Sequence, residues 1–206
     1  MVQYKLVYFP VRGRGDHIRQ LFKVANVDFE DYIVPFAEWQ DFKKTMPLGQ
    51  LPVLEVDGQQ IGESVSIARY LGKQFDMAGA TALESARLDM IADAVQEMTN
   101  LIPYHDWVRI QLEWVKGDKE AYFKEKVLPV AVQFAEKIEK HITGPYLLGE
   151  KITWVDVFIA EHFSKVQDFG QNDALKDFPK LENLIKKVNS LPAMEKYIAD
   201  RPNTDF

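Results

Sequence analysis

Side chains able to do chemistry are few in this sequence. Its 206 residues include no cysteine, so the chain has no disulfide, thiolate ligand or cysteine nucleophile, and sulfur chemistry needs a sulfur that a substrate brings. No nucleophilic-serine (GxSxG) or phosphate-loop motif occurs. The histidines lack metal-site spacing, so we expect no bound metal and a structural or exposed position for each of them: His17, His105, His141 and His162.

One tyrosine near the N-terminus is a candidate for chemistry on a thiol. A free thiol has a pKa of about 8.5 and is only a few per cent ionised at pH 7. The Tyr8 hydroxyl could donate a hydrogen bond to a thiolate, which favours the charged form and lowers the pKa of the thiol. On its own, however, the pattern favours a half-buried strand aromatic like Tyr4, because tyrosines favour strands.

The elements around Tyr8 form a mixed α/β pattern. Residues 3–9 alternate in polarity and predict a strand, and a loop with Gly13 and Gly15 leads into an amphipathic helix. A short strand at 29–34 and a weak helix or loop at 38–44 follow. The turn Asp57-Gly58 between apolar segments predicts a β-hairpin, and Ser64 begins another helix. The order β-α-β then β-β-α predicts a thioredoxin-like sheet, whose use without cysteine is to bind a cysteine-containing peptide.

The rest of the chain is all-helical. A short linker at 76–82 separates residues 1–75 from a helical domain at 83–206. Thr153 and Asp156 have the spacing of a capping box, which indicates a role in folding. A clear apolar face predicts a helix over 84–98, and further helices are expected over segments separated by glycine or proline: 119–140, 154–168, 179–190 and 192–200.

Charge and hydropathy exclude several classes of protein. The net charge is −6 and no basic run occurs, so we expect no nucleic-acid partner. The N-terminus lacks the apolar core of a signal peptide, and no stretch approaches the roughly 18 apolar residues of a membrane span. We therefore expect a soluble cytoplasmic protein with no membrane partner.

Over its whole length the chain resembles the cytosolic glutathione transferases, most closely the sigma class, which includes nematode enzymes and glutathione-dependent prostaglandin D synthase. The resemblance implies a homodimer, with glutathione as co-substrate. The likeness rests on YKLVYFPVRGRG at 4–15, Trp39, Lys43, PLGQLPVLEVDG at 47–58, ESVSIARYL at 63–71 and TWVD at 153–156.

The resemblance implies that Tyr8 and Arg14 are catalytic, with the Tyr8 hydroxyl holding the thiolate and Arg14 supporting its charge. It also implies a cis Leu51–Pro52 bond, which lets the Leu51 backbone bond the cysteinyl amide of glutathione. Ser64, at a helix start, is suited to the γ-glutamyl carboxylate. The glutathione site expected by resemblance comprises Tyr8, Arg14, Trp39, Lys43, Gly49, Gln50, Leu51, Pro52, Glu63, Ser64 and Glu97.

Three of these assignments carry a qualification from the residue type. Trp39 and Lys43, four residues apart, resemble the pair that holds the glycyl end, but they also suit an exposed aromatic beside a solvated lysine. Sigma-like chains often have glutamine at the position of Glu63, whose carboxylate would pair with the ammonium and repel the carboxylate of glutathione. Glu97, or Asp93 on the same helix, would reach the partner's site in a dimer.

The second substrate would be a hydrophobic electrophile. Its expected lining is Phe9, Val11, Gly13, Thr99, Tyr104 and Phe206, although aromatic residues at these positions also suit an ordinary core. The leading hypothesis is a transferase that attaches the glutathione thiolate to such electrophiles in detoxification, and prostaglandin isomerisation would use the same thiolate. Two alternatives are a ligandin that binds haem or other apolar ligands, and a catalytically silent, crystallin-like relative.

Overall fold

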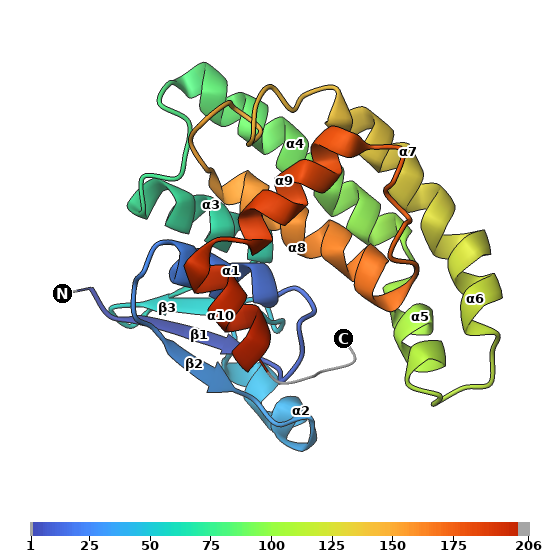
Figure 1. The fold of residues 1–206 in the computed structure, drawn as a ribbon. Helices are drawn as coiled ribbons and strands as arrows, with labels where there is room; N and C mark the ends of the chain where they lie inside the picture. Colours follow the sequence, from blue (N-terminus) through green and yellow to red (C-terminus); the bar gives the residue numbers. More distant parts are fainter. Residues whose placement is uncertain (1, 202–206) are drawn as a thin grey trace. The chain divides into compact units, whose positions relative to one another are not determined.

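The computed structural model describes residues 2–201, which form two units. The first unit contains residues 2–76 and the segment from Leu191 to Arg201, and the second contains Met77–Ser190. The last helix, α10 (Pro192–Asp200), packs on α1 (Asp16–Val24) within the first unit (Figure 1). This placement differs from the sequence-based division, which assigned all of 83–206 to the helical domain. The difference arises because local periodicity predicts a helix but not the surface on which it packs.

The first unit is built on a four-stranded sheet in the order β2-β1-β3-β4 (Figure 1). β1 (Tyr4–Tyr8) pairs in parallel with β2 (Glu30–Ile33) and antiparallel with β3 (Val53–Val56), which forms a hairpin with β4 (Gln59–Ile61). The φ angles at the hairpin turn are +48° for Asp57 and +82° for Gly58, as a two-residue turn requires. The thioredoxin-like arrangement expected from the element order is confirmed.

The two faces of β1 pack against different helices. Val7 faces a cluster with Val53, to which α2 (Trp39–Phe42) contributes Trp39 and Phe42. Short 3₁₀ turns, Phe36–Glu38 and Lys43–Thr45, flank α2. On the other face the Tyr4 ring lies 5.3 Å from that of Phe22 in α1, and α1 packs on α3 (Ser64–Gln74). Because strand side chains alternate, Tyr8 shares the α1 face with Tyr4.

The second unit is helical in its described residues. α8 (Trp154–Phe169) is buried at every residue from Trp154 to Val166 and packs on α9 (Pro179–Asn189) and α4 (Ala82–Leu101) (Figure 1). One short helix between Pro103 and Gly117, α5 (Tyr104–Gln111), was not predicted from the sequence. The other helical elements are α6 (Lys119–Tyr122), a π-helical turn (Phe123–Val127) and α7 (Leu128–Glu139).

The predicted capping box at the start of α8 is present. The Asp156 carboxylate accepts a 2.7 Å hydrogen bond from the Thr153 backbone N–H. It accepts a second 2.7 Å hydrogen bond from the backbone N–H of Leu147, which lies outside the helix. One carboxylate therefore satisfies donors of both the helix start and the preceding segment. Within residues 2–201 no helix is both long and apolar enough to cross a membrane.

Candidate functional site

Tyr8 lies at the end of β1 beneath the loop of residues 9–15. Its side chain is 6% exposed, and the Arg14 backbone N–H donates a 2.7 Å hydrogen bond to its hydroxyl oxygen. A Cβ atom at Gly13 would lie 2.3 Å from the Tyr8 hydroxyl oxygen, and one at Gly15 would lie 2.3 Å from the ring atom Cδ1. The loop backbone therefore contacts the Tyr8 side chain directly, and only glycine, which has no Cβ atom, allows this contact at these two positions.

The electrostatic surroundings keep the Tyr8 hydroxyl protonated. Burial raises the pKa of Tyr8 above its usual value, while the Arg14 N–H and the charges of Arg19 and Arg14 partly offset this effect. The hydroxyl is therefore neutral at pH 7. Because its oxygen accepts from Arg14, its hydrogen is suited to a bond with an anion such as a thiolate.

A small pocket, which we call the α3 pocket, lies where α3 begins. The Leu51–Pro52 peptide bond in its wall is cis, which confirms that expectation. Its volume is only about 20 Å³, and Leu48 Cδ1 lies 3.3 Å from the position of a Cβ at Gly62 in the same wall. It is lined by Arg14, Leu48, Gln50, Leu51, Pro52, Gly62, Glu63 and Ser64.

The start of α3 has an unusual backbone. Glu63 has a φ of +64° and a ψ of 112°, a conformation that side-chain-bearing residues rarely adopt. Ser64 follows as the first helical residue and is buried. His17 Nε2 of α1 lies 3.4 Å from the Ser64 carbonyl oxygen. Glu63 and Ser64 thus place the start of α3 in the wall of the pocket, and helix starts are suited to bind carboxylates.

Comparison with known proteins identifies the family. Residues 4–73 match the family model "Glutathione S-transferase, N-terminal domain", and residues 91–201 match "Glutathione S-transferase, C-terminal domain". The chain belongs to the glutathione S-transferase family. It is 44% identical to the probable glutathione S-transferase gst-36 of Caenorhabditis elegans, over 99% of each chain.

Two further relatives bear on the class and substrate of this transferase. Human hematopoietic prostaglandin D synthase is 35% identical over 99% of each chain. The solved structure of a Nu-class transferase from Haemonchus contortus superposes with a TM-score of 0.84 at 36% identity, over 100% of each chain.

The α3 pocket brings together six of the residues expected to bind glutathione: Arg14, Gln50, Leu51, Pro52, Glu63 and Ser64. Trp39 is half-buried, with its ring 5.2 Å from that of Phe9 in an edge-to-face contact. The Lys43 side chain is exposed, and its Cε lies 3.5 Å from the position of a Cβ at Gly49. Neither Trp39 nor Lys43 lines the α3 pocket.

The residues expected around the electrophile are spread over both units. Phe9 packs on Phe36 and Trp39, and Val11 lines a separate cavity of about 700 Å³ in the first unit. In the second unit the buried Thr99 donates its hydroxyl to the Val95 carbonyl at 2.6 Å, and Tyr104 packs its ring near Trp107. Phe206 lies outside the described residues, and the electrophile lining stays a prediction.

The residues proposed to reach a partner subunit are both exposed on α4. They are Asp93 and Glu97, whose side chains point away from the buried residues Leu88, Ala92 and Val95 of the same helix. This exposure fits a role at a second subunit, which stays a prediction. Within residues 2–201, no group of three or more acidic, histidine or cysteine side chains is placed to hold a metal ion.

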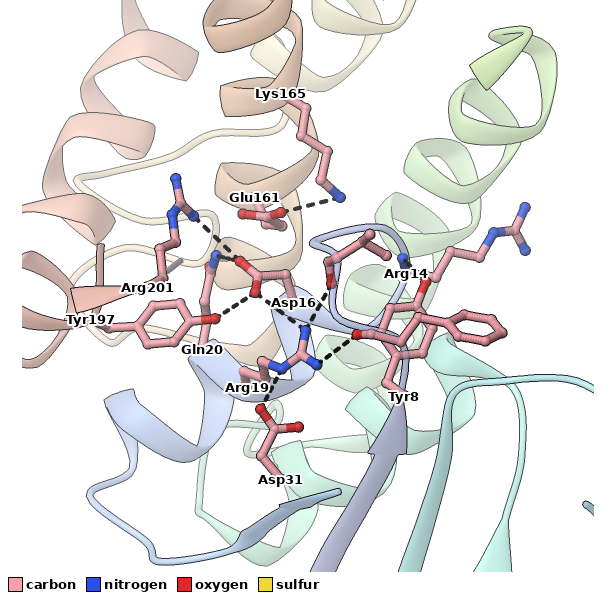
Figure 2. A network of polar contacts seen from close by, with 12 residues as sticks. Tyr8, Arg14, Asp16, Arg19, Gln20, Asp31, Glu161, Lys165, Tyr197 and Arg201 are labelled. Atoms are coloured by element: carbon pink, nitrogen blue, oxygen red, sulfur yellow. Dashed lines mark hydrogen bonds and ion pairs between the residues drawn. The ribbon is translucent and has the colours of Figure 1, made fainter. Parts of the chain in front are cut away.

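A polar network around the buried Asp16, beside Tyr8, was not predicted from the sequence. Its members are Asp16, Arg19, Gln20, Asp31, Tyr197 and Arg201, which we call the Asp16 network (Figure 2). The local signals are two spacings at the start of α1: Arg19 lies three residues and Gln20 four residues after Asp16. The remaining members, Asp31, Tyr197 and Arg201, come from β2 and from α10 with its C-cap, which no local pattern links to α1.

Proposed function

We propose that this glutathione transferase activates its co-substrate through Tyr8. The neutral, buried Tyr8 hydroxyl, held by the Arg14 backbone N–H, carries the proposal. By donating its hydrogen to the sulfur of bound glutathione, it favours the thiolate over the thiol. A fall of about two units in the thiol pKa, roughly 2.7 kcal/mol, would leave most of the bound glutathione nucleophilic at pH 7.

The rest of glutathione would lie along the α3 pocket. The Leu51 backbone beside the cis proline is suited to the cysteinyl amide, and the start of α3 with Ser64 to the γ-glutamyl carboxylate. Lys43, and Trp39 through its indole N–H, would bind the glycyl end. The thiolate, held in place, then attacks the electrophilic carbon of a hydrophobic substrate and forms a thioether.

Several finer assignments belong to the same proposal. We propose a homodimer in which Glu97 approaches the partner's glutathione, and the exposed apolar Leu83 and Met90 on the same helix support a subunit contact there. We propose the sigma class, because the motifs of the chain resemble that class. The chain is also similar to the structure of a Nu-class transferase. We also propose a cytoplasmic location.

The test compares Tyr8→Phe with the native protein, using initial rates of glutathione conjugation to a dinitrohalobenzene. Loss of the hydroxyl should lower kcat/KM at least tenfold, about 1.4 kcal/mol, and raise the pKa of the bound thiol toward its free value. Tyr4→Phe, in the same strand and on the same face, should leave the rate unchanged. Equal activity of native protein and Tyr8→Phe would contradict the role of Tyr8.

Calorimetric titration with glutathione separates the remaining alternatives. A native protein that binds glutathione but has no transferase activity would favour the ligandin function. A protein that does not bind glutathione would share only the fold of the family.

Prostaglandin isomerisation is a second candidate activity, favoured by the 35% identity to human hematopoietic prostaglandin D synthase. The same Tyr8-held thiolate would act on an endoperoxide. Incubating the protein with prostaglandin H₂ and glutathione should yield prostaglandin D₂, and Tyr8→Phe should abolish most of this conversion. Product at the uncatalysed level in both proteins would exclude this activity.

A further inference from the structure

The Asp16 carboxylate connects α1 to the C-terminal helix. Asp16 is 2% exposed, and its oxygens accept hydrogen bonds from the Tyr197 hydroxyl, from Arg201 Nη1 at 3.3 Å and from Gln20 Nε2 at 3.0 Å (Figure 2). Two of these three donors belong to α10 and its C-cap. A buried carboxylate needs such partners because desolvation disfavours its charge. α10 and its C-cap therefore supply two of the three donors that hold the Asp16 carboxylate in place.

Arg19 carries this connection to the loop that follows Tyr8. Its Nη1 lies 3.7 Å from the Asp16 carboxylate and donates to the Val11 carbonyl at 2.9 Å. Nη2 donates to the Phe9 carbonyl at 3.2 Å, and Nε donates to Asp31 at 2.8 Å (Figure 2). Because the guanidinium is a rigid planar fork, fixing it at Asp16 and Asp31 also fixes both loop carbonyls.

The Arg19 guanidinium also faces Tyr8 itself. Its Cζ lies 5.6 Å from the centre of the Tyr8 ring, and Phe9, whose carbonyl it holds, directly follows Tyr8 in the chain. The charged groups that act on the Tyr8 hydroxyl are Arg19 and Arg14, which lower its pKa, and Asp16, which raises it. Partners that offset the negative charge of Asp16 therefore weaken its effect on the pKa of Tyr8, which makes the Tyr8 hydroxyl a stronger hydrogen-bond donor.

We propose that Tyr197 and Arg201 are positioning residues for the transferase reaction. By holding Asp16, they keep Arg19 on the Phe9 and Val11 carbonyls and so keep the Tyr8 hydroxyl where it meets the thiolate. The C-terminal helix thus contributes to catalysis without touching the substrate. This inference rests on the proposed role of Tyr8.

The first variant is Tyr197→Phe, which removes one hydroxyl and keeps the ring. At a pH below the pKa of the bound thiol, we expect kcat/KM to fall about three- to tenfold, while KM for glutathione stays within about twofold of the native value. The pKa of bound glutathione, measured from the ultraviolet absorbance of its thiolate, should rise by about half a unit to one unit. Tyr32→Phe is the matched control, a half-buried tyrosine of the same unit that stacks on Phe42, and should change none of these values.

A double-mutant cycle with Tyr8→Phe distinguishes positioning from general stabilisation. If Tyr197 acts through Tyr8, adding Tyr197→Phe to Tyr8→Phe should cause almost no further loss of kcat/KM. A merely structural role would give additive losses and an unchanged pKa of the bound thiol, and that result would overturn the inference.

A second variant tests whether the other Asp16 partner from the C-terminal segment has the same effect as Tyr197. Arg201→Gln removes the charge that faces Asp16 and should shift the pKa of bound glutathione in the same direction. No shift in either variant, while Tyr8→Phe loses activity, would overturn the positioning role alone. Full activity of Tyr8→Phe would instead overturn the proposed function beneath it.

Discussion

Two helix starts of the second unit and two of the first differ in how their backbone donors are satisfied. In the second unit, α8 begins with the Thr153–Asp156 capping box and α4 with the Thr81–Glu84 capping box. In the first unit, α1 begins after Gly15 and α3 after Glu63, and neither cap residue makes a side-chain hydrogen bond. α4 and α8 thus follow the local rule for helix starts, whereas α1 and α3 do not; α5, α7 and α9 of the second unit also begin without a capping side chain.

The uncapped starts of α1 and α3 lie at the proposed glutathione site. The backbone N–H of Arg14, just before α1, donates to the Tyr8 hydroxyl, and the start of α3 lines the α3 pocket. A capping side chain at Glu63 would occupy the first amide donors of α3, which we propose to bind a ligand carboxylate, and any side chain at Gly15 would clash with the Tyr8 ring. At the starts of α1 and α3, the absence of a capping side chain leaves space and backbone donors for the proposed site.

The largest expected effect lies at the capped start of α8. Asp156→Ala removes a fully buried acceptor and leaves the Thr153 and Leu147 N–H groups without it, so we expect the free energy of unfolding to fall by about 2–4 kcal/mol. Urea denaturation measures this. Glu84→Ala at the exposed box of α4 should cost only about 1 kcal/mol. Equal losses of unfolding free energy in the two variants would mean that burial does not determine how much a capping box stabilises the protein.

A tenfold effect on activity is expected at the uncapped start of α1. Gly15 has a φ of −96° and a ψ of −23°, which alanine adopts freely, so Gly15→Ala tests only the contact with the Tyr8 ring. The added Cβ should displace the ring and lower kcat/KM roughly tenfold. Gly58→Asn is the control, since no atom lies within 4 Å of a Cβ there and asparagine tolerates positive φ. Native activity of Gly15→Ala would show that the ring has room to move.

The smallest effect is expected at Glu63. Glu63→Gln keeps the positive-φ backbone and removes a negative charge beside the proposed carboxylate site, so KM for glutathione should fall about two- to fivefold. Because the residue is exposed, the difference should shrink at high salt. Glu195→Gln, on the exposed surface of α10, should leave KM unchanged. A higher KM in Glu63→Gln would indicate that the carboxylate pairs with the ammonium of glutathione instead.

Local rules explain which elements were predictable from the sequence. The alternation of residues 3–9 became β1, Asp57-Gly58 became the hairpin turn and Thr153–Asp156 became the cap of α8. Helix α5 escaped prediction because its eight residues bury only Trp107 and Ile110, too few to show a helical period. The cis Leu51–Pro52 bond was expected from motif resemblance alone.

The sequence by itself determined the elements, the thioredoxin-like order and the motifs of a glutathione transferase, because these depend on residues close together in the chain. Only the tertiary structure decided that α10 packs on α1 and that Tyr197 meets Asp16, 181 residues earlier. The conformation of Glu63 and the close fit of Gly15 on Tyr8 were decided there too. Such contacts follow from burying whole elements against one another, and no local pattern of residue types specifies which distant side chains then meet.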